Sequence, residues 1–247
     1  MSNASAPRVV LVTNATQYAG PGIVDALLAG GCRLLCHDPA FASEEERRGY
    51  EATQPGATAL AQQQPDALIA EANSAASEID AFVFNDVYPI TKRPIEDIPL
   101  DDLRATFEAV MATPFRLAQL ALPALKARRR GAILFITSAR ERRPEAGYAV
   151  PTAIRAATTA FAKALALEAA PFEIQVNVVA PNYLASELYY PKARFVDDPA
   201  GRAAIAKIVP FGRLGQPEEI GELVAFLVSG KSPFTTGQTI GFTGGWA

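Results

Sequence analysis

Three residues in the middle of the chain carry the side chains needed for proton transfer at a hydroxyl group. Ser138 ends the apolar run GAILFITS, and Tyr148 and Arg155 follow it. A tyrosine accepts a proton from a substrate hydroxyl only when a nearby cation lowers its pKa from about 10. Arginine stays protonated and supplies such a cation, while a serine hydroxyl can donate a hydrogen bond to the same substrate oxygen. Ser138, Tyr148 and Arg155 are therefore the candidate catalytic residues.

The spacing of the tyrosine and the arginine is unusual for one helix. The position one turn before Arg155, where two side chains meet most naturally, holds Pro151. Tyr148 lies about 10 Å from Arg155 along a helix axis, against about 6 Å for the usual spacing. Because proline is tolerated in a first helical turn, we expect Tyr148 to enter the site from just before a helix. Each of the three residues also has a purely structural interpretation. Tyr148 could be a loop aromatic packed over the core, Ser138 a turn residue, and Arg155 a helix-surface residue.

The elements that must position these residues alternate along the chain. We predict strands at residues 8–13, 32–38, 81–86, 131–138, 174–181 and 236–245, and helices at 22–31, 66–75, 103–128, 152–169 and 217–229. Such alternation is typical of a Rossmann-like α/β fold, a doubly wound parallel sheet with helices on both faces and ligands at the carboxyl ends of the strands. Residues 41–64 show no clear pattern, and residues 182–215 are expected to form an irregular loop region over the site. We expect one domain over residues 1–247.

The composition argues against several classes of function. The net charge of −3 gives no general attraction to nucleic acid or to membranes. No apolar stretch approaches the roughly 18 residues that a membrane span requires. Cys32 and Cys36 suit neither a zinc site nor a disulfide, so we interpret them as core thiols in a reducing compartment. We therefore expect a cytoplasmic protein.

The turn after the first strand departs from the pattern of a dinucleotide site. Such a site needs glycines so that the backbone can approach the pyrophosphate at a helix N-terminus. The loop keeps Gly20 and Gly22 but places the bulky Tyr18 where close approach is required. Asp38 stands where an acid would bind a ribose, although an aspartate before a proline is equally a turn residue. We therefore expect that the protein uses no cofactor.

Further motifs follow in order along the chain. The first motif consists of Thr13, Tyr18 and Gly20, and the second, Asn85 and Asp86, comes at the end of the third predicted strand. The third motif comes at the end of the strand predicted at 174–181 and consists of Pro181, Asn182, Tyr183 and Leu184. The fourth is Tyr190, which precedes Pro191. In this combination the chain resembles the short-chain dehydrogenase/reductase superfamily and, within it, the halohydrin dehalogenases. In those dehalogenases the aromatic residue of the first loop fills the space of the nicotinamide cofactor and leaves a small halide pocket.

The resemblance implies a cofactor-independent enzyme. It would convert vicinal haloalcohols into epoxides with release of halide and, in reverse, open epoxides with small anionic nucleophiles. Ser138 and Arg155 fall where the family's catalytic serine and arginine fall, whereas Pro151 stands in the place of the family's tyrosine. The resemblance places six residues in the halide pocket: Tyr18, Pro181, Asn182, Tyr183, Leu184 and Tyr190.

The resemblance also predicts an assembly and leaves two other functions open. The long helices at 103–128 and 152–169 resemble the faces that pair in this superfamily, so we expect a homotetramer, with a dimer as the alternative. The chain could instead be a catalytically altered or inactive homologue that lost its base to Pro151. A nicotinamide-dependent reductase is the third candidate; Tyr18, Asn182 and Met111, which stands near the reductases' proton-relay asparagine, count against it.

Overall fold

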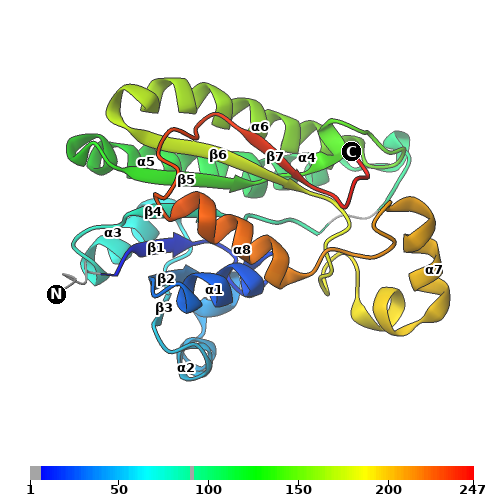
Figure 1. Ribbon diagram of the computed structural model, residues 1–247, viewed down its shortest axis with the longest axis horizontal. Coiled ribbons are helices and arrows are strands. Elements are labelled where there is room, and N and C mark those ends of the chain that lie inside the picture. The colour runs from blue at the N-terminus through cyan, green and yellow to red at the C-terminus, as the bar shows by residue number, and fades with distance from the viewer. Residues whose placement is uncertain (1–6, 90–91) are drawn as a thin grey trace.

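A parallel sheet of seven strands forms the centre of the molecule, in the order β3-β2-β1-β4-β5-β6-β7 (Figure 1). The computed structural model describes residues 7–89 and 92–247. The strands are β1 (Val9–Val12), β2 (Arg33–His37), β3 (Ala57–Leu60), β4 (Ala81–Phe84), β5 (Gly131–Ile136), β6 (Ile174–Pro181) and β7 (Thr239–Phe242). The strand order reverses direction between β1 and β4, which confirms the predicted doubly wound fold.

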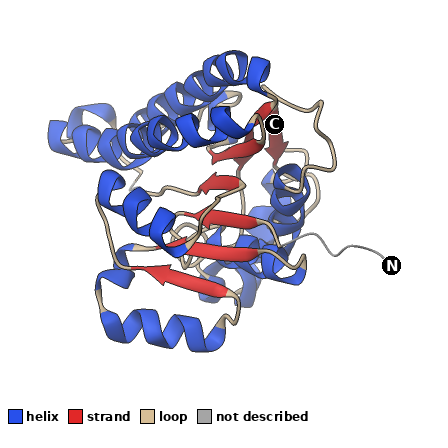
Figure 2. Ribbon diagram, turned by 90° about the vertical axis from the view of Figure 1, so that its left-hand side faces the viewer, coloured by secondary structure: helices blue, strands red, loops and turns tan. Residues whose placement is uncertain are grey.

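Helices cover both faces of the sheet (Figure 2). They are α1 (Gly20–Ala29), α2 (Glu44–Thr53), α3 (Pro65–Ala75), α4 (Leu100–Phe107), α5 (Thr113–Arg128), α6 (Ala149–Ala169), α7 (Pro199–Ile208) and α8 (Pro217–Val228). One apolar core joins the sheet to α3, α5 and α6, and a second joins the opposite face to α1 and α8. No helix in the described part of the chain is long and apolar enough to cross a membrane.

Three elements were missed in the sequence because they bury few side chains. Helix α2 has no buried residue, and in α7 only Ile205 is buried, so neither shows a clear apolar stripe. Strand β3 has four residues, of which only two are buried. The segment predicted as one helix at 103–128 contains a π-helical turn, Glu108–Ala112, between α4 and α5. The Thr158 hydroxyl of α6 donates a hydrogen bond to the Val110 carbonyl of this turn, at 2.9 Å.

Glycines let α1 and α8 approach closely at the start of the first loop. A Cβ atom on Gly22 would lie 1.9 Å from the Pro217 carbonyl oxygen, and one on Gly221 would lie 2.1 Å from the Gly22 carbonyl oxygen. Gly22 is therefore required by packing, without any pyrophosphate.

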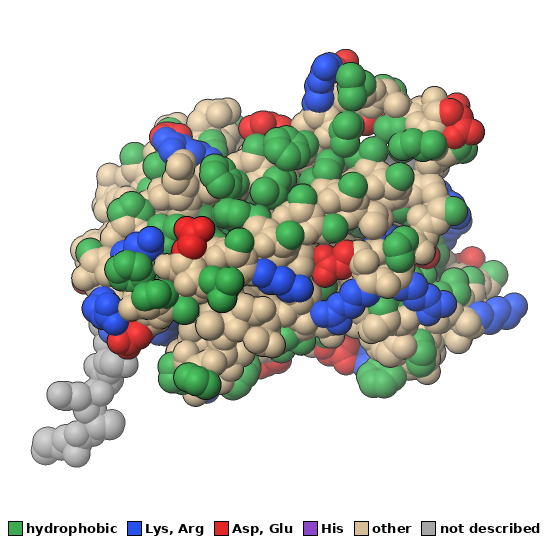
Figure 3. All heavy atoms as spheres, turned by 90° about the horizontal axis from the view of Figure 1, so that it is seen from above, with side chains coloured by type: hydrophobic (Ala, Val, Ile, Leu, Met, Phe, Trp, Pro, Cys, Tyr) green, Lys and Arg blue, Asp and Glu red, His purple; other side chains and the backbone are tan. Residues whose placement is uncertain are grey.

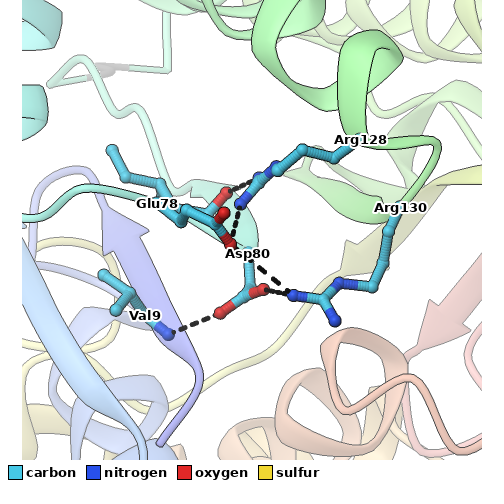
Figure 4. Close-up of polar contacts among 6 residues, drawn as sticks. Val9, Glu78, Asp80, Arg128 and Arg130 are labelled. Atoms are coloured by element: carbon cyan, nitrogen blue, oxygen red, sulfur yellow. Dashed lines mark hydrogen bonds and ion pairs between the residues drawn. The ribbon is translucent and has the colours of Figure 1, made fainter. Parts of the chain in front are cut away.

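Charged side chains tie the amino ends of the central strands together (Figure 4). Asp80 accepts hydrogen bonds from the Val9 amide at 3.0 Å and from Arg130 at 3.1 Å. Arg128 donates to the Glu78 carboxylate at 3.1 Å and to the Ile79 carbonyl at 2.6 Å. These bonds hold the amino ends of the strands together, and the candidate catalytic residues lie at the opposite, carboxyl ends.

Candidate active site

A cavity of about 420 Å³ at the carboxyl ends of the strands brings the three predicted catalytic residues together. Ser138, Tyr148 and Arg155 all line it. Four of the six predicted pocket residues line it as well: Tyr18, Pro181, Asn182 and Tyr190. Residues from three separate connections, those after β1, β5 and β6, therefore meet in one space.

Ser138 and Arg155 are held beside each other by the end of β5. Arg155 projects from α6 and is 5% exposed, and its Nη1 donates a hydrogen bond to the Ile136 carbonyl at 2.7 Å. Ser138 lies two residues after the end of that strand, and its Oγ accepts a hydrogen bond from the Arg140 amide at 3.2 Å. Because this bond uses a lone pair, the hydroxyl proton of Ser138 remains available for a substrate oxygen.

Tyr148 enters the cavity from just before α6, as the sequence predicts. The helix begins at Ala149, Tyr148 occupies the N-cap position, and Pro151 lies in the first turn. The cation packed on the Tyr148 ring is Arg140, whose guanidinium carbon lies 4.2 Å from the ring centroid. Arg140 in turn pairs with Glu145 at 2.7 Å. Tyr148 thus lies within the site, and the cation on its ring is not Arg155.

A second tyrosine, which the sequence analysis did not single out, shares the cavity with Arg155. Tyr189 lines the same cavity, and its hydroxyl donates a hydrogen bond to the Tyr88 carbonyl at 3.0 Å. The pKa of Tyr189 is raised above its ordinary value, because burial outweighs the opposing positive charge of Arg155. The ring packs edge-on against Tyr18, with centroids 5.1 Å apart. The only signal in the sequence was the doubled tyrosine before Pro191.

The part of the cavity near Tyr18 offers neutral hydrogen-bond donors. Asn182 is 4% exposed, its Oδ1 accepts from the Tyr183 amide at 3.0 Å, and its Nδ2 is buried without a partner among the described residues. Burial raises the pKa of Tyr18 and of Tyr190, so both phenols stay protonated at neutral pH. Buried neutral donors and ring edges are suited to a small monovalent anion.

Tyr183 and Leu184 do not line this cavity, in contrast to the prediction. Tyr183 has a left-handed backbone (φ 57°), its ring packs against Trp246 at 5.4 Å between centroids, and its hydroxyl donates to Glu145 at 3.2 Å. Leu184 is fully buried in the core beneath the sheet. Neither side chain therefore forms part of the wall of the cavity that contains Ser138 and Arg155.

Asn85 and Asp86 support the site from the end of β4. The Asn85 amide donates to the carbonyls of Asn14 at 3.0 Å and Gln17 at 2.9 Å, which fixes the loop that carries Tyr18. Asp86 is 5% exposed, and burial raises its pKa to about 7, although a hydrogen bond from Thr13 and the charge of Arg155 lower it.

Comparisons with known proteins agree with this fold. A family model described as enoyl-(acyl carrier protein) reductase matches residues 20–247. The chain therefore belongs to the short-chain dehydrogenase/reductase superfamily. Its sequence relatives include L-fucose dehydrogenase of Oryctolagus cuniculus, which is 31% identical over 97% of this chain and 85% of that protein.

Solved structures show a likeness to a narrower group. A protein described as a dehalogenation enzyme has a TM-score of 0.94 and 37% identity, covering 98% of each chain. Halohydrin dehalogenase HheC, bound to ethyl (2S)-oxiran-2-ylacetate, has a TM-score of 0.93 and 34% identity, covering 96% of each chain. Within the superfamily, the chain is thus similar to halohydrin dehalogenases over almost its whole length.

The residues present do not fit the nicotinamide dinucleotide that reductases of this superfamily use. The Asp38 carboxylate, which would bind a ribose, accepts hydrogen bonds from the Thr16 amide at 3.0 Å, the Thr16 hydroxyl at 2.7 Å and the Ala40 amide at 3.1 Å. Tyr18 extends into the cavity beside the catalytic residues. Met111, near the position of a relay asparagine, packs in an apolar cluster with Val150 and Ile154.

Proposed function

We propose that this protein is a halohydrin dehalogenase that works without a nicotinamide cofactor. It would convert vicinal haloalcohols into epoxides with release of halide and, in the reverse direction, open epoxides with small anions. The observation that carries the proposal is that Ser138 and Arg155 share one cavity with Tyr18 and with the amide nitrogen of Asn182, which has no hydrogen-bond partner in the described part of the chain. A hydroxyl-activating pair and an anion site thus lie side by side.

The residues can divide the reaction as follows. The Ser138 hydroxyl donates a hydrogen bond to the substrate oxygen, and a cavity tyrosine, Tyr148 or another, accepts the proton of that hydroxyl under the influence of Arg155. The oxygen then forms a bond to the neighbouring carbon while the carbon–halogen bond breaks and the halide leaves with the electron pair. Asn182 Nδ2 and the phenol of Tyr190 would receive the halide.

Bromide release from 2-bromoethanol, measured without any nucleotide, tests this function. We expect turnover by the wild-type protein and a loss of about 100-fold in Ser138→Ala, because one donor to a developing oxyanion contributes about that much. Ser74→Ala, on the exposed face of α3, is the matched control and should retain full activity.

Two results would favour the other candidate functions. Bromide binding without turnover of any haloalcohol would indicate a homologue that lost its base at Pro151. Calorimetric binding of NADH or NADPH would indicate a reductase and would contradict the reasoning from Tyr18 and Asp38.

We also propose that the protein acts as a homotetramer, with a dimer as the alternative. Apolar side chains spread over the side of the molecule where α5 and α6 lie (Figure 3). On these helices and the adjoining α4, Phe107 is 49%, Phe115 42% and Leu167 79% exposed. Large exposed apolar surfaces of this kind mark protein interfaces. Light scattering should give the mass of a tetramer, and Phe107→Asp should reduce it; a monomeric wild type would refute the assembly.

A further inference from the structure

The proposed chemistry needs a phenol near Arg155, and the helix cannot provide it. The position one turn before Arg155 is Pro151, which lines the cavity but has no group that accepts a proton. The base must therefore come from another segment that reaches the cavity into which Arg155 projects.

Tyr189 lines the same cavity as Arg155, and three contacts hold it there. Its ring is held edge-on by Tyr18 at 5.1 Å, and its hydroxyl is held by the Tyr88 carbonyl at 3.0 Å. Its amide donates to the Ser186 Oγ at 3.3 Å, which fixes the turn that carries it. Arg155 lines the same cavity, and its positive charge offsets part of the rise that burial causes in the pKa of Tyr189. Tyr189 is thus a preorganised phenol in the cavity that contains Ser138.

Tyr148 is less suited to the same role. Its ring lies against Arg140, and Arg140 is already paired with Glu145 at 2.7 Å. The Glu145 carboxylate therefore offsets part of the positive charge that lies against the Tyr148 ring.

We propose that Tyr189 is the catalytic base of this protein and takes the place of the tyrosine that Pro151 replaces. The inference rests on the proposed dehalogenase function. The Tyr189 phenolate oxygen takes the proton from the substrate hydroxyl, the resulting alkoxide forms the C–O bond of the epoxide, and the halide leaves with the electrons of the C–X bond. The proton passes from Tyr189 to water before the next turnover, so one haloalcohol gives one epoxide, one halide and one proton.

The test compares two variants that each lose one cavity hydroxyl. Bromide release from 2-bromoethanol is measured for wild type, Tyr189→Phe and Tyr148→Phe, and bromide binding is measured by quenching of Trp246 fluorescence. We expect kcat to fall at least about 100-fold in Tyr189→Phe, as for loss of a general base, and less than about threefold in Tyr148→Phe. Both variants should bind bromide as the wild type does.

The possible outcomes separate the inference from the function on which it rests. A wild type that releases no bromide refutes the dehalogenase function and the inference with it. Wild-type activity that survives in Tyr189→Phe and is lost in Tyr148→Phe overturns the inference alone and makes Tyr148 the base. Equal losses in both variants also overturn it.

A double variant tests whether the two positions supply the same group. Pro151→Tyr, combined with Tyr189→Phe, places a phenol one turn before Arg155 again. We expect at least a tenfold recovery of kcat over Tyr189→Phe. If the double variant folds and binds bromide but shows no recovery of kcat, Tyr189 does not take the place of a tyrosine at position 151.

Discussion

Replacement of Asp86 by asparagine is expected to stabilise the protein at alkaline pH and to do so much less at acidic pH. Burial raises the pKa of Asp86 from 3.8 to about 7, even though Thr13 and Arg155 act in the opposite direction. The folded state therefore binds the proton more tightly than the unfolded chain does. Stability falls as the pH rises between the two pKa values, and the loss is complete above the folded value.

The magnitude follows from the pKa values. Each pKa unit corresponds to 1.36 kcal/mol, so the two units between pH 5 and the folded pKa of about 7 amount to roughly 3 kcal/mol as an upper value. Asp86→Asn removes this ionisation, and the new amide oxygen can still accept from the Asn14 side chain, which lies 3.5 Å from Asp86 Oδ1. Its stability relative to wild type should rise by about 2–3 kcal/mol between pH 5 and pH 8.5.

Urea unfolding at both pH values measures this difference. Asp25→Asn, on the exposed side of α1, is the control and should show no such dependence. The same stability difference between Asp86→Asn and wild type at pH 5 and pH 8.5 would refute the reasoning from burial.

The remaining predictions concern packing and the catalytic cation. Gly22→Ala should destabilise the protein by about 1–3 kcal/mol, because its Cβ would lie 1.9 Å from the Pro217 carbonyl oxygen. Gly49→Ala, in α2 with open space around it, should stabilise by about 0.5–1 kcal/mol; urea unfolding measures both, and the same sign for the two would contradict the packing argument. Arg155→Met should reduce bromide release at least about 100-fold, because the tyrosine base loses its cation. It should also lower the melting temperature, because the Ile136 carbonyl loses its hydrogen-bond donor. A variant that stays active would show that Arg155 has no part in the mechanism.

The sheet was predictable because its strands are buried on both faces. Strands such as β5 and β6 are continuous runs of buried residues, and such runs are visible in the sequence without any tertiary information. Helix α7 was not predictable, since its only buried residue, Ile205, gives no periodic pattern. Amphipathic patterns report burial, so elements that lie on the surface escape them.

The candidate site divides in the same way. Ser138 and Asn182 were predictable because each lies within two residues of the end of a buried strand, and the carboxyl ends of parallel strands meet on one side of the sheet. The roles of the tyrosines after β6 could not be predicted from the sequence, because the direction of each side chain depends on backbone angles within the turn. Tyr183 has a left-handed backbone and does not line the cavity, whereas Tyr189 does.

The transfer of the base from a helix to a loop would change what the catalytic geometry depends on. A tyrosine at position 151 would share one rigid helix with Arg155, so their separation would be set by helix geometry alone. Tyr189 is instead positioned by Tyr88, which follows β4, by Ser186, which follows β6, and by Tyr18, which follows β1. Three connections must then hold their places for one proton transfer, so small changes in any of them would alter the distance from Tyr189 to Arg155. Helix α1 follows the Tyr18 loop, so its tight packing on α8 also helps to hold the proposed catalytic residues in position.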